Sequence, residues 1–158
     1  MEMDQDAIIR YIAETFAAGV EAITGDDGYG EGDTFFFYDL DRDTDPTRRL
    51  PFATIVSKDY GEFDNASNLD RPGVFRLNIG VGRNAYIALF GEPPDVAIWG
   101  DSEHDFTALD RLLPHPVYAS QWWVCVLNPG VETFAQEIQP LLAEAHGLDA
   151  RRHRSRRP

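Results

Sequence analysis

Apolar and polar residues follow two different periods along the chain, and each period predicts a kind of element. In residues 4–16 the apolar Ile8, Ile12 and Phe16 fall on one helical face, which predicts an amphipathic helix. In residues 74–81 apolar and polar side chains alternate, which predicts a strand with one buried and one wetter face. The chain therefore combines helices with strands.

Further runs of β-favouring residues predict the other strands of a sheet. They are residues 20–24, 34–38, 51–57 and 117–127. The second and third of these runs are expected to form a hairpin. In the last run, alternation places Trp122 and Val124 on one face and Trp123 and Cys125 on the other.

Two helices are predicted between the last two strands. The first covers residues 84–90 and ends before Gly91, a residue that favours the end of a helix. The second covers residues 102–113, because its first four residues match a capping box. Apolar residues then continue at helical spacing until Pro114 stops the pattern.

A closing helix is predicted after the last strand. Asn128 and Pro129 supply a cap and a first residue, Pro140 is expected to kink the helix, and Gly147 is expected to end it. The residues that it is expected to bury are Phe134, Ile138, Leu141, Leu142 and Ala145.

The order of these elements predicts the α+β class. Helix, strands, helices, strand and helix follow one another, which favours an antiparallel sheet of about five strands with helices packed mainly on one face. A chain of 158 residues has the usual size of one domain. We expect a single domain over residues 1–150 and a disordered Arg-rich tail over residues 151–158.

Charge limits the partners of this domain. Residues 1–150 hold all 27 acidic residues and nine of the 14 basic ones, so their net charge is −18, whereas the tail carries +5. Proteins bind nucleic acids largely by neutralising phosphates with Lys and Arg. Nucleic acid is therefore not an expected partner.

The chain is expected to work in the cytoplasm. It shows no signal peptide and no apolar run of membrane-spanning length, so no membrane contact is expected. Cys125 is the only cysteine, which excludes an internal disulfide and fits a reducing compartment. No cofactor is expected, because the glycine-rich segments carry acids where a phosphate would lie.

Three stretches carry a resemblance to known proteins. The segments VFRLNIG, HDFTALDRLLPHPVY and WWVCVLNPGVETFAQEIQPLLAEAHGL together resemble a family of small actinobacterial proteins of unassigned function, over nearly the whole chain. More distantly, the FRLN strand, the Trp-bearing strand and the final helix resemble the YjbR-like proteins, whose fold is related to that of frataxin. This resemblance implies a curved antiparallel sheet with helices, but no reaction.

One group of residues is a candidate for proton transfer. His104, Asp105, His115 and Tyr118 lie around the predicted 102–113 helix and the Pro-His-Pro turn after it. Histidine titrates near neutral pH, and a carboxylate that orients it makes a general base. The alternative is structural, because Asp105 also belongs to the capping box and His115 can be part of a packed turn.

A second group is a candidate ligand-binding wall. Arg76 and Asn78 project from the same strand face, and Trp122 or Trp123 can adjoin them from a neighbouring strand. Arg binds carboxylates with two hydrogen bonds, and Trp offers a flat apolar surface, so this wall suits a small polar or anionic ligand. The alternative is an exposed sheet face on which Arg76 pairs with acidic residues.

A metal site is not expected. Alternating acids, as in a calcium loop, occur at Asp39, Asp41, Asp43 and Asp45. The pattern fails as an EF-hand, because Thr44 stands where glycine is needed and Leu50 where a glutamate is needed. We interpret the run as a solvated hairpin loop.

These observations support three hypotheses of function. The leading one is a small binding or accessory domain that receives a small polar molecule or a protein partner on its sheet face. The second is a small enzyme of bacterial secondary metabolism in which His104 or His115 acts as acid or base. The third is a structural protein that forms a homodimer through exposed aromatic residues.

Overall fold

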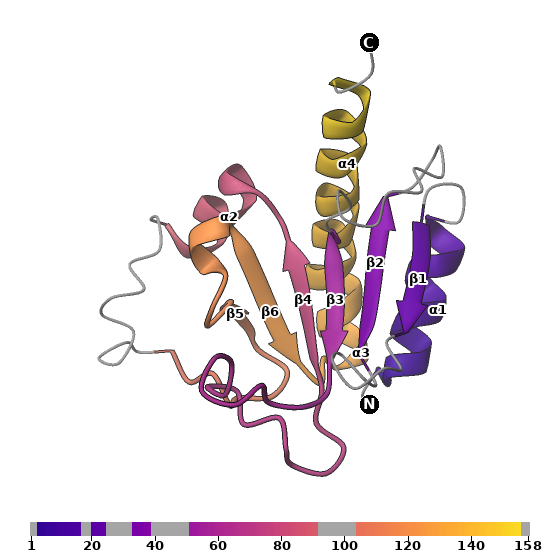
Figure 1. Ribbon diagram of the computed structural model, residues 1–158. Helices are drawn as coiled ribbons and strands as arrows, with labels where there is room; N and C mark the ends of the chain where they lie inside the picture. The colour runs from indigo at the N-terminus through magenta and orange to yellow at the C-terminus, as the bar shows by residue number, and fades with distance from the viewer. Residues whose placement is uncertain (1–2, 17–19, 25–32, 39–50, 92–103, 156–158) are drawn as a thin grey trace.

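The fold is a sheet whose one face is covered by helices, as the computed structural model in Figure 1 shows. The structure describes residues 3–16, 20–24, 33–38, 51–91 and 104–155. In this part of the chain every neighbouring pair of strands is antiparallel. The predicted α+β class is confirmed.

The sheet has six strands within the described residues, in the order β1-β2-β3-β4-β6-β5. They are β1 (Val20–Thr24), β2 (Thr34–Tyr38), β3 (Ala53–Val56), β4 (Arg76–Gly80), β5 (Leu112–Pro114) and β6 (Trp123–Leu127). The first four strands follow one another in sequence, whereas β6 lies between β4 and β5. The two central strands of the sheet are therefore β3 and β4.

In the described part of the chain, helices lie before the first strand, between the later strands and after the last strand. They are α1 (Gln5–Thr15), α2 (Arg83–Phe90), the short η2 (Ala119–Gln121), and the consecutive α3 (Val131–Thr133), η3 (Phe134–Ile138) and α4 (Gln139–Ser155). Asp4 caps α1 by accepting a hydrogen bond of 2.8 Å from the backbone N–H of Ala7. No helix in the described ranges is long and apolar enough to cross a membrane.

The main core lies between the sheet and these helices. Ile8 and Ile12 of α1 and Leu142 of α4 join Leu77 and Ile79 of β4 in one buried cluster. The side chains predicted to be buried in the closing helix are buried. In Figure 1, α1 and α4 lie behind the sheet. The other face of the strands is thus left for loops and for the site described below.

The closing helix differs from its prediction at both ends. It begins at Val131 after the cap residue Gly130, and it runs past Gly147 to Ser155. Asn128 does not cap it: its side chain accepts from the Phe75 N–H and donates to the Gly73 carbonyl, both in the connection between β3 and β4. The helix thus includes the first residues of the Arg-rich segment, whose disorder stays a prediction.

A π-helical segment lies just before Pro140, where the sequence predicts a kink, and the kink itself stays a prediction. The segment Phe134–Ile138 directly precedes the turn that contains Pro140. Proline has no N–H to donate, and its ring collides with the carbonyl of the preceding turn in a regular α-helix. A wider π-turn relieves this collision and lets the helix continue.

The helix predicted over residues 102–113 is wrong where the structure describes it. Residues 104–111 form turns and loop, and Leu112–Pro114 form β5. Asp105 accepts hydrogen bonds from the N–H and the hydroxyl of Thr107, at 3.0 and 2.6 Å, and so closes a local turn instead of starting a helix.

The strand predicted over residues 117–127 is shorter than expected. Only Trp123–Leu127 pair with their neighbours, while η2 occupies the preceding residues. Trp122 separates the two elements in a left-handed conformation, with φ of 66°. This turn directs the indole rings of Trp122 and Trp123 to different surroundings.

The wetter face predicted for β4 is wrong. Arg76 and Asn78 are only 1% and 2% exposed. Strand alternation correctly separates them from the helix-covered face, but residues of the β3–β4 connection cover Arg76, and Asn78 binds Arg76 and Thr54. Asp64 and Ser67 of this connection both bind the Arg76 guanidinium.

Candidate functional site

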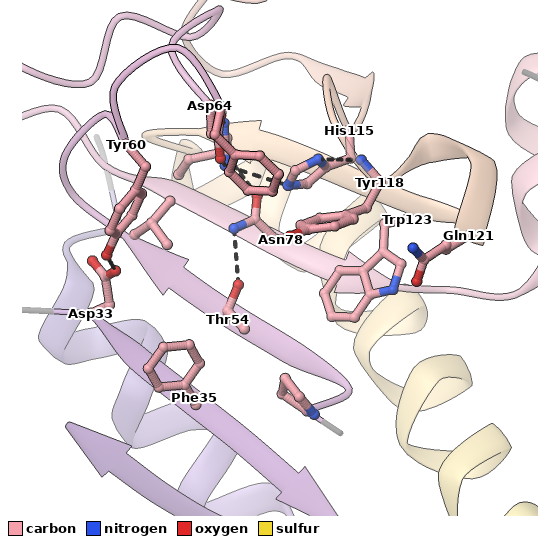
Figure 2. Close-up of a pocket in the computed structure, with 14 residues that line it drawn as sticks. Asp33, Phe35, Thr54, Tyr60, Asp64, Asn78, His115, Tyr118, Gln121 and Trp123 are labelled. Carbon is pink, nitrogen blue, oxygen red and sulfur yellow. Dashed lines mark hydrogen bonds and ion pairs between the residues drawn. The ribbon is translucent and has the colours of Figure 1, made fainter. Parts of the chain in front are cut away.

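A pocket of about 360 Å³ opens on the sheet face opposite the helices. Figure 2 shows its side chains converging from the strands and from the loops over them. Among the described residues, those that line it are Asp33, Phe35, Pro51, Thr54, Val56, Tyr60, Phe63, Asp64, Arg76, Asn78, His115, Tyr118, Gln121 and Trp123. A concave site with mostly apolar walls and few polar groups is typical of ligand pockets.

The strand register places the predicted wall residues together. Asn78 lies opposite Thr54 on β3, and Gly80 lies opposite Trp123 on β6. Arg76, Asn78 and Gly80 are two residues apart on β4 and so share one face, which Trp123 joins as the partner of Gly80. The prediction that Arg76, Asn78 and Trp123 share one sheet face is therefore confirmed.

Gly80 gives the Trp123 indole its place in the wall. A Cβ atom at position 80 would lie 2.9 Å from Cε2 of Trp123, which is closer than side chains approach. Gly80→Ala is therefore expected to displace the indole and to lower the free energy of unfolding by about 1–3 kcal/mol. Tryptophan emission and urea denaturation measure these two effects.

Gly147→Ala is the matched control for this substitution. Gly147 lies inside α4, where a Cβ would meet only the end of the Arg151 side chain at 3.5 Å. Alanine is the better helix former, so this variant is expected to gain up to about 1 kcal/mol and to keep the wild-type emission. Equal effects of the two variants would contradict the close packing of Trp123 on Gly80.

Arg76 is the fixed polar centre of the pocket floor. Its Nη1 and Nη2 atoms donate to the two carboxylate oxygens of Asp64 at 3.0 and 2.6 Å. Nη1 also donates to the Ser67 hydroxyl at 2.9 Å, and Nε donates to Oδ1 of Asn78 at 2.7 Å. The Asn78 amide in turn donates to the Thr54 hydroxyl at 2.9 Å, as Figure 2 shows. The network holds these side chains in one arrangement.

His115 is buried beside Arg76, and its protonation follows from its contacts. Its Nδ1 accepts hydrogen bonds from the N–H groups of Val117 and Tyr118, at 3.0 and 2.9 Å. Burial, with the nearby Arg76 charge, holds the pKa of His115 well below its usual range. The ring is therefore neutral, and its single proton is on Nε2.

The contact between His115 and Arg76 is a contact between two donors. Nε2 of His115 lies 3.4 Å from Nη2 of Arg76. Both nitrogens carry hydrogen, so neither accepts from the other. The two N–H groups can both donate hydrogen bonds to an acceptor atom of a ligand at this end of the pocket.

Asp33 forms the opposite end of the pocket. It is 1% exposed, and Figure 2 shows the Tyr60 hydroxyl donating to its Oδ2 atom. Its Oδ1 atom accepts from the Ser57 N–H at 3.3 Å. Burial raises the pKa of Asp33, while the hydrogen bonds from Tyr60 and Ser57 act in the opposite direction.

Aromatic rings make up much of the wall between these two ends. They belong to Phe35, Tyr60, Phe63, Tyr118 and Trp123. Phe63 and Tyr118 are 61% and 37% exposed, and their ring centroids are 6.1 Å apart. The ring of Tyr118 also lies 5.1 Å from that of His115. The pocket thus offers flat apolar surfaces to a ligand.

The structure brings together only part of the predicted catalytic group. His115 and Tyr118 line the pocket, whereas His104 lies beside Phe90 and Phe106, with ring centroids 6.1 Å away in both cases. Asp105 is exposed and closes its local turn. Neither His104 nor Asp105 is part of the pocket lining.

Trp122 does not line the pocket either. Its indole packs against the helix-side core, 5.6 Å from the Tyr86 ring and 6.0 Å from the Arg83 guanidinium. Of the two tryptophans that sequence reasoning left open for the wall, Trp123 is the one in the pocket. The pair therefore reports on the two opposite faces of the sheet.

The remaining candidates from the sequence are Cys125 and the acidic run at residues 39–45. Cys125 is buried, and burial raises the pKa of its thiol to about 12, so this thiol is inert. The acidic run at residues 39–45 lies outside the described residues. In the part of the chain that is described, no group of three or more His, Cys, Asp and Glu side chains could hold a metal ion.

Sequence reasoning missed Asp33 and its partner Tyr60. Asp33 directly precedes the aromatic run of β2, and Tyr60 lies in the polar connection after β3. Neither has a motif around it, and the two are 27 residues apart. Only the pairing of β2 with β3 brings their neighbourhoods together.

Comparison with known proteins identifies the family. Residues 3–158 match a family of unknown function, DUF6194, and the chain belongs to it. No curated protein and no solved structure matches the chain. The more distant resemblance to YjbR-like proteins, like the actinobacterial source, stays a prediction.

Proposed function

We propose that this member of DUF6194 is a small-molecule-binding domain whose ligand occupies the pocket over β2, β3, β4 and β6. The observation that carries the proposal is the rigid polar floor built on Arg76, inside a pocket with aromatic walls. Binding costs less free energy when the polar groups of a site are already held in place.

The network is more elaborate than stability requires. A buried ion pair such as Arg76–Asp64 is often no more stabilising than well-packed apolar residues of the same size. Here both residues of the pair line a cavity, and the adjoining His115 and Asn78 line it as well. A role in recognising a ligand explains this placement.

The alternative of an enzyme with histidine acid–base chemistry has less support. A general base needs a nitrogen that can take up a proton, but Nδ1 of His115 already accepts two backbone N–H groups and Nε2 carries the proton. His104 and Asp105 lie outside the pocket lining. We therefore assign His115 the role of a hydrogen-bond donor to the ligand.

A screen for ligands of the native protein tests the proposal. A metabolite panel is added to the purified chain, and compounds that raise the thermal midpoint are kept, because a ligand at 100 times its Kd stabilises by about 2.7 kcal/mol. Each is then titrated while the indole N–H resonances are recorded by NMR. We expect the Trp123 resonance to shift, since Trp123 lines the pocket.

Trp122 provides the control on the opposite face of the sheet. Its resonance is expected to stay in place, because it packs against Tyr86 on the helix side. The variants Trp122→Phe and Trp123→Phe assign the two signals. A panel in which no compound moves the Trp123 signal would contradict the proposal and favour a protein partner at the exposed Phe63 and Tyr118.

A further inference from the structure

The pocket has no positive charge to spare for an anionic ligand. Arg76 is the only Lys or Arg among its described lining residues, and the carboxylate of Asp64 already binds it with two hydrogen bonds. His115 is neutral for the reasons given above. Asp64 therefore occupies the place at Arg76 where the sequence predicts the carboxylate of a ligand.

Asp33 forms no ion pair with a described residue, although the charges of Lys58 and Arg76 act on it from farther away and lower its pKa. Among the described residues, no Lys, Arg or His nitrogen lies within 4.0 Å of its carboxylate. Its hydrogen-bond donors are the Tyr60 hydroxyl and the Ser57 N–H, both neutral groups. A buried carboxylate gains most from a positive charge brought to it, because burial weakens its interaction with water.

The surroundings of Asp33 also favour a cation. Tyr60 contacts Asp33 directly, and Figure 2 shows Phe35 below them on the same side of the pocket. The faces of aromatic rings attract ammonium groups through their negative quadrupole, and the Lys58 ammonium already lies 5.6 Å from the centroid of the Tyr60 ring, which leaves the Phe35 ring for a ligand. The whole chain carries a net charge of −13, which draws cations toward it and repels anions.

Resting on the proposed function, we propose that the ligand is an organic cation, an amine whose ammonium group binds the Asp33 carboxylate between the aromatic walls of the pocket. The apolar part of the ligand then extends over Thr54 and Asn78 toward Trp123. An acceptor atom at the far end of the ligand can accept hydrogen bonds from the N–H groups of His115 and Arg76.

Three probes of similar size separate charge from shape. They are 2-phenylethylamine, which is a cation at neutral pH, 2-phenylethanol, which is neutral, and 3-phenylpropanoate, which is an anion. Each is titrated into the full chain at neutral pH while the Trp123 indole resonance is followed. We expect the amine to bind at least about tenfold more tightly than the alcohol, and the anion more weakly than both.

Asp33→Asn tests the residue that selects the charge. The variant is expected to lose the preference, so that the amine binds as weakly as the alcohol while the affinity for the alcohol stays within about threefold. Glu62→Gln is the matched control, because it removes one negative charge from an exposed position beside Phe63. It should keep the preference of the wild type for the amine.

The outcomes separate this inference from the proposed function. If the alcohol or the anion binds at Trp123 as tightly as the amine, or if the amine gives no saturable shift, the pocket does not select a cation and the inference is wrong. The proposed function fails only if no compound of the metabolite panel moves the Trp123 signal. Comparing the probes on the wild type keeps the test valid even if Asp33→Asn does not fold.

Discussion

Asp64→Asn is expected to lower the free energy of unfolding by about 3–5 kcal/mol. The substitution keeps the shape of the side chain but removes the charge that faces the Arg76 guanidinium. Arg76 is 1% exposed, so its charge would stay in the protein interior with only neutral partners, Ser67 and Asn78. Urea denaturation followed by far-UV circular dichroism measures the loss.

Two further variants show whether burial causes this loss. Glu144→Gln breaks the exposed ion pair with Arg151, whose nitrogen lies 3.8 Å from the carboxylate, and should cost less than about 0.5 kcal/mol. Adding Arg76→Met to Asp64→Asn removes the unpaired charge and should restore most of the lost stability. A cost for Asp64→Asn no larger than that of Glu144→Gln would mean that the Arg76–Asp64 pair is not buried in solution.

The behaviour of β4 shows what alternation can and cannot predict. Period-two alternation correctly groups Phe75, Leu77 and Ile79 on the core face and Arg76 with Asn78 on the other. It does not say what covers the second face. The polar connection that brings Asp64 to Arg76 has no period of its own, so the burial of Arg76 could not be predicted.

The failed helix over residues 102–113 has a different cause. An aspartate can fill the last position of a capping box or close a turn on the backbone that follows it, so the residue type does not decide between the two. Asp105 does the second, with Thr107 as its partner. Leu112 and Leu113 then pair with β6, a tertiary contact that local spacing does not contain.

The candidate site was predictable where it depends on one strand face or one turn. Arg76, Asn78 and Trp123 follow from alternation, and His115 and Tyr118 follow from the turn that contains Pro114. Asp33 was not predictable, because its role depends on burial and on Tyr60, far away in sequence. The residue to which we assign charge selection is therefore visible only in the fold.

Acidification is expected to destabilise the chain through His115. The unfolded chain takes up this proton near pH 6.5, whereas the folded protein, in which the pKa of His115 is held well below that value, takes it up only at lower pH. Below pH 6.5 the unfolded state therefore binds more protons, and stability falls by up to about 1.4 kcal/mol per pH unit. Urea denaturation at pH 7.5, 6.5 and 5.5 measures this slope.

His115→Asn isolates the contribution of this residue. The asparagine oxygen can still accept from the N–H groups of Val117 and Tyr118, but it does not titrate. Burial lowers the pKa of His146, which acts in the same direction, and raises that of Asp33, which acts in the opposite one. Both groups remain in the variant, so the difference between the two curves reports His115 alone.

We expect the variant to lose less stability than the wild type on going from pH 6.5 to 5.5. Parallel curves would mean that His115 takes up its proton in the folded protein as easily as in the unfolded chain. The assignment of His115 as a buried, neutral hydrogen-bond donor in the pocket would then be wrong.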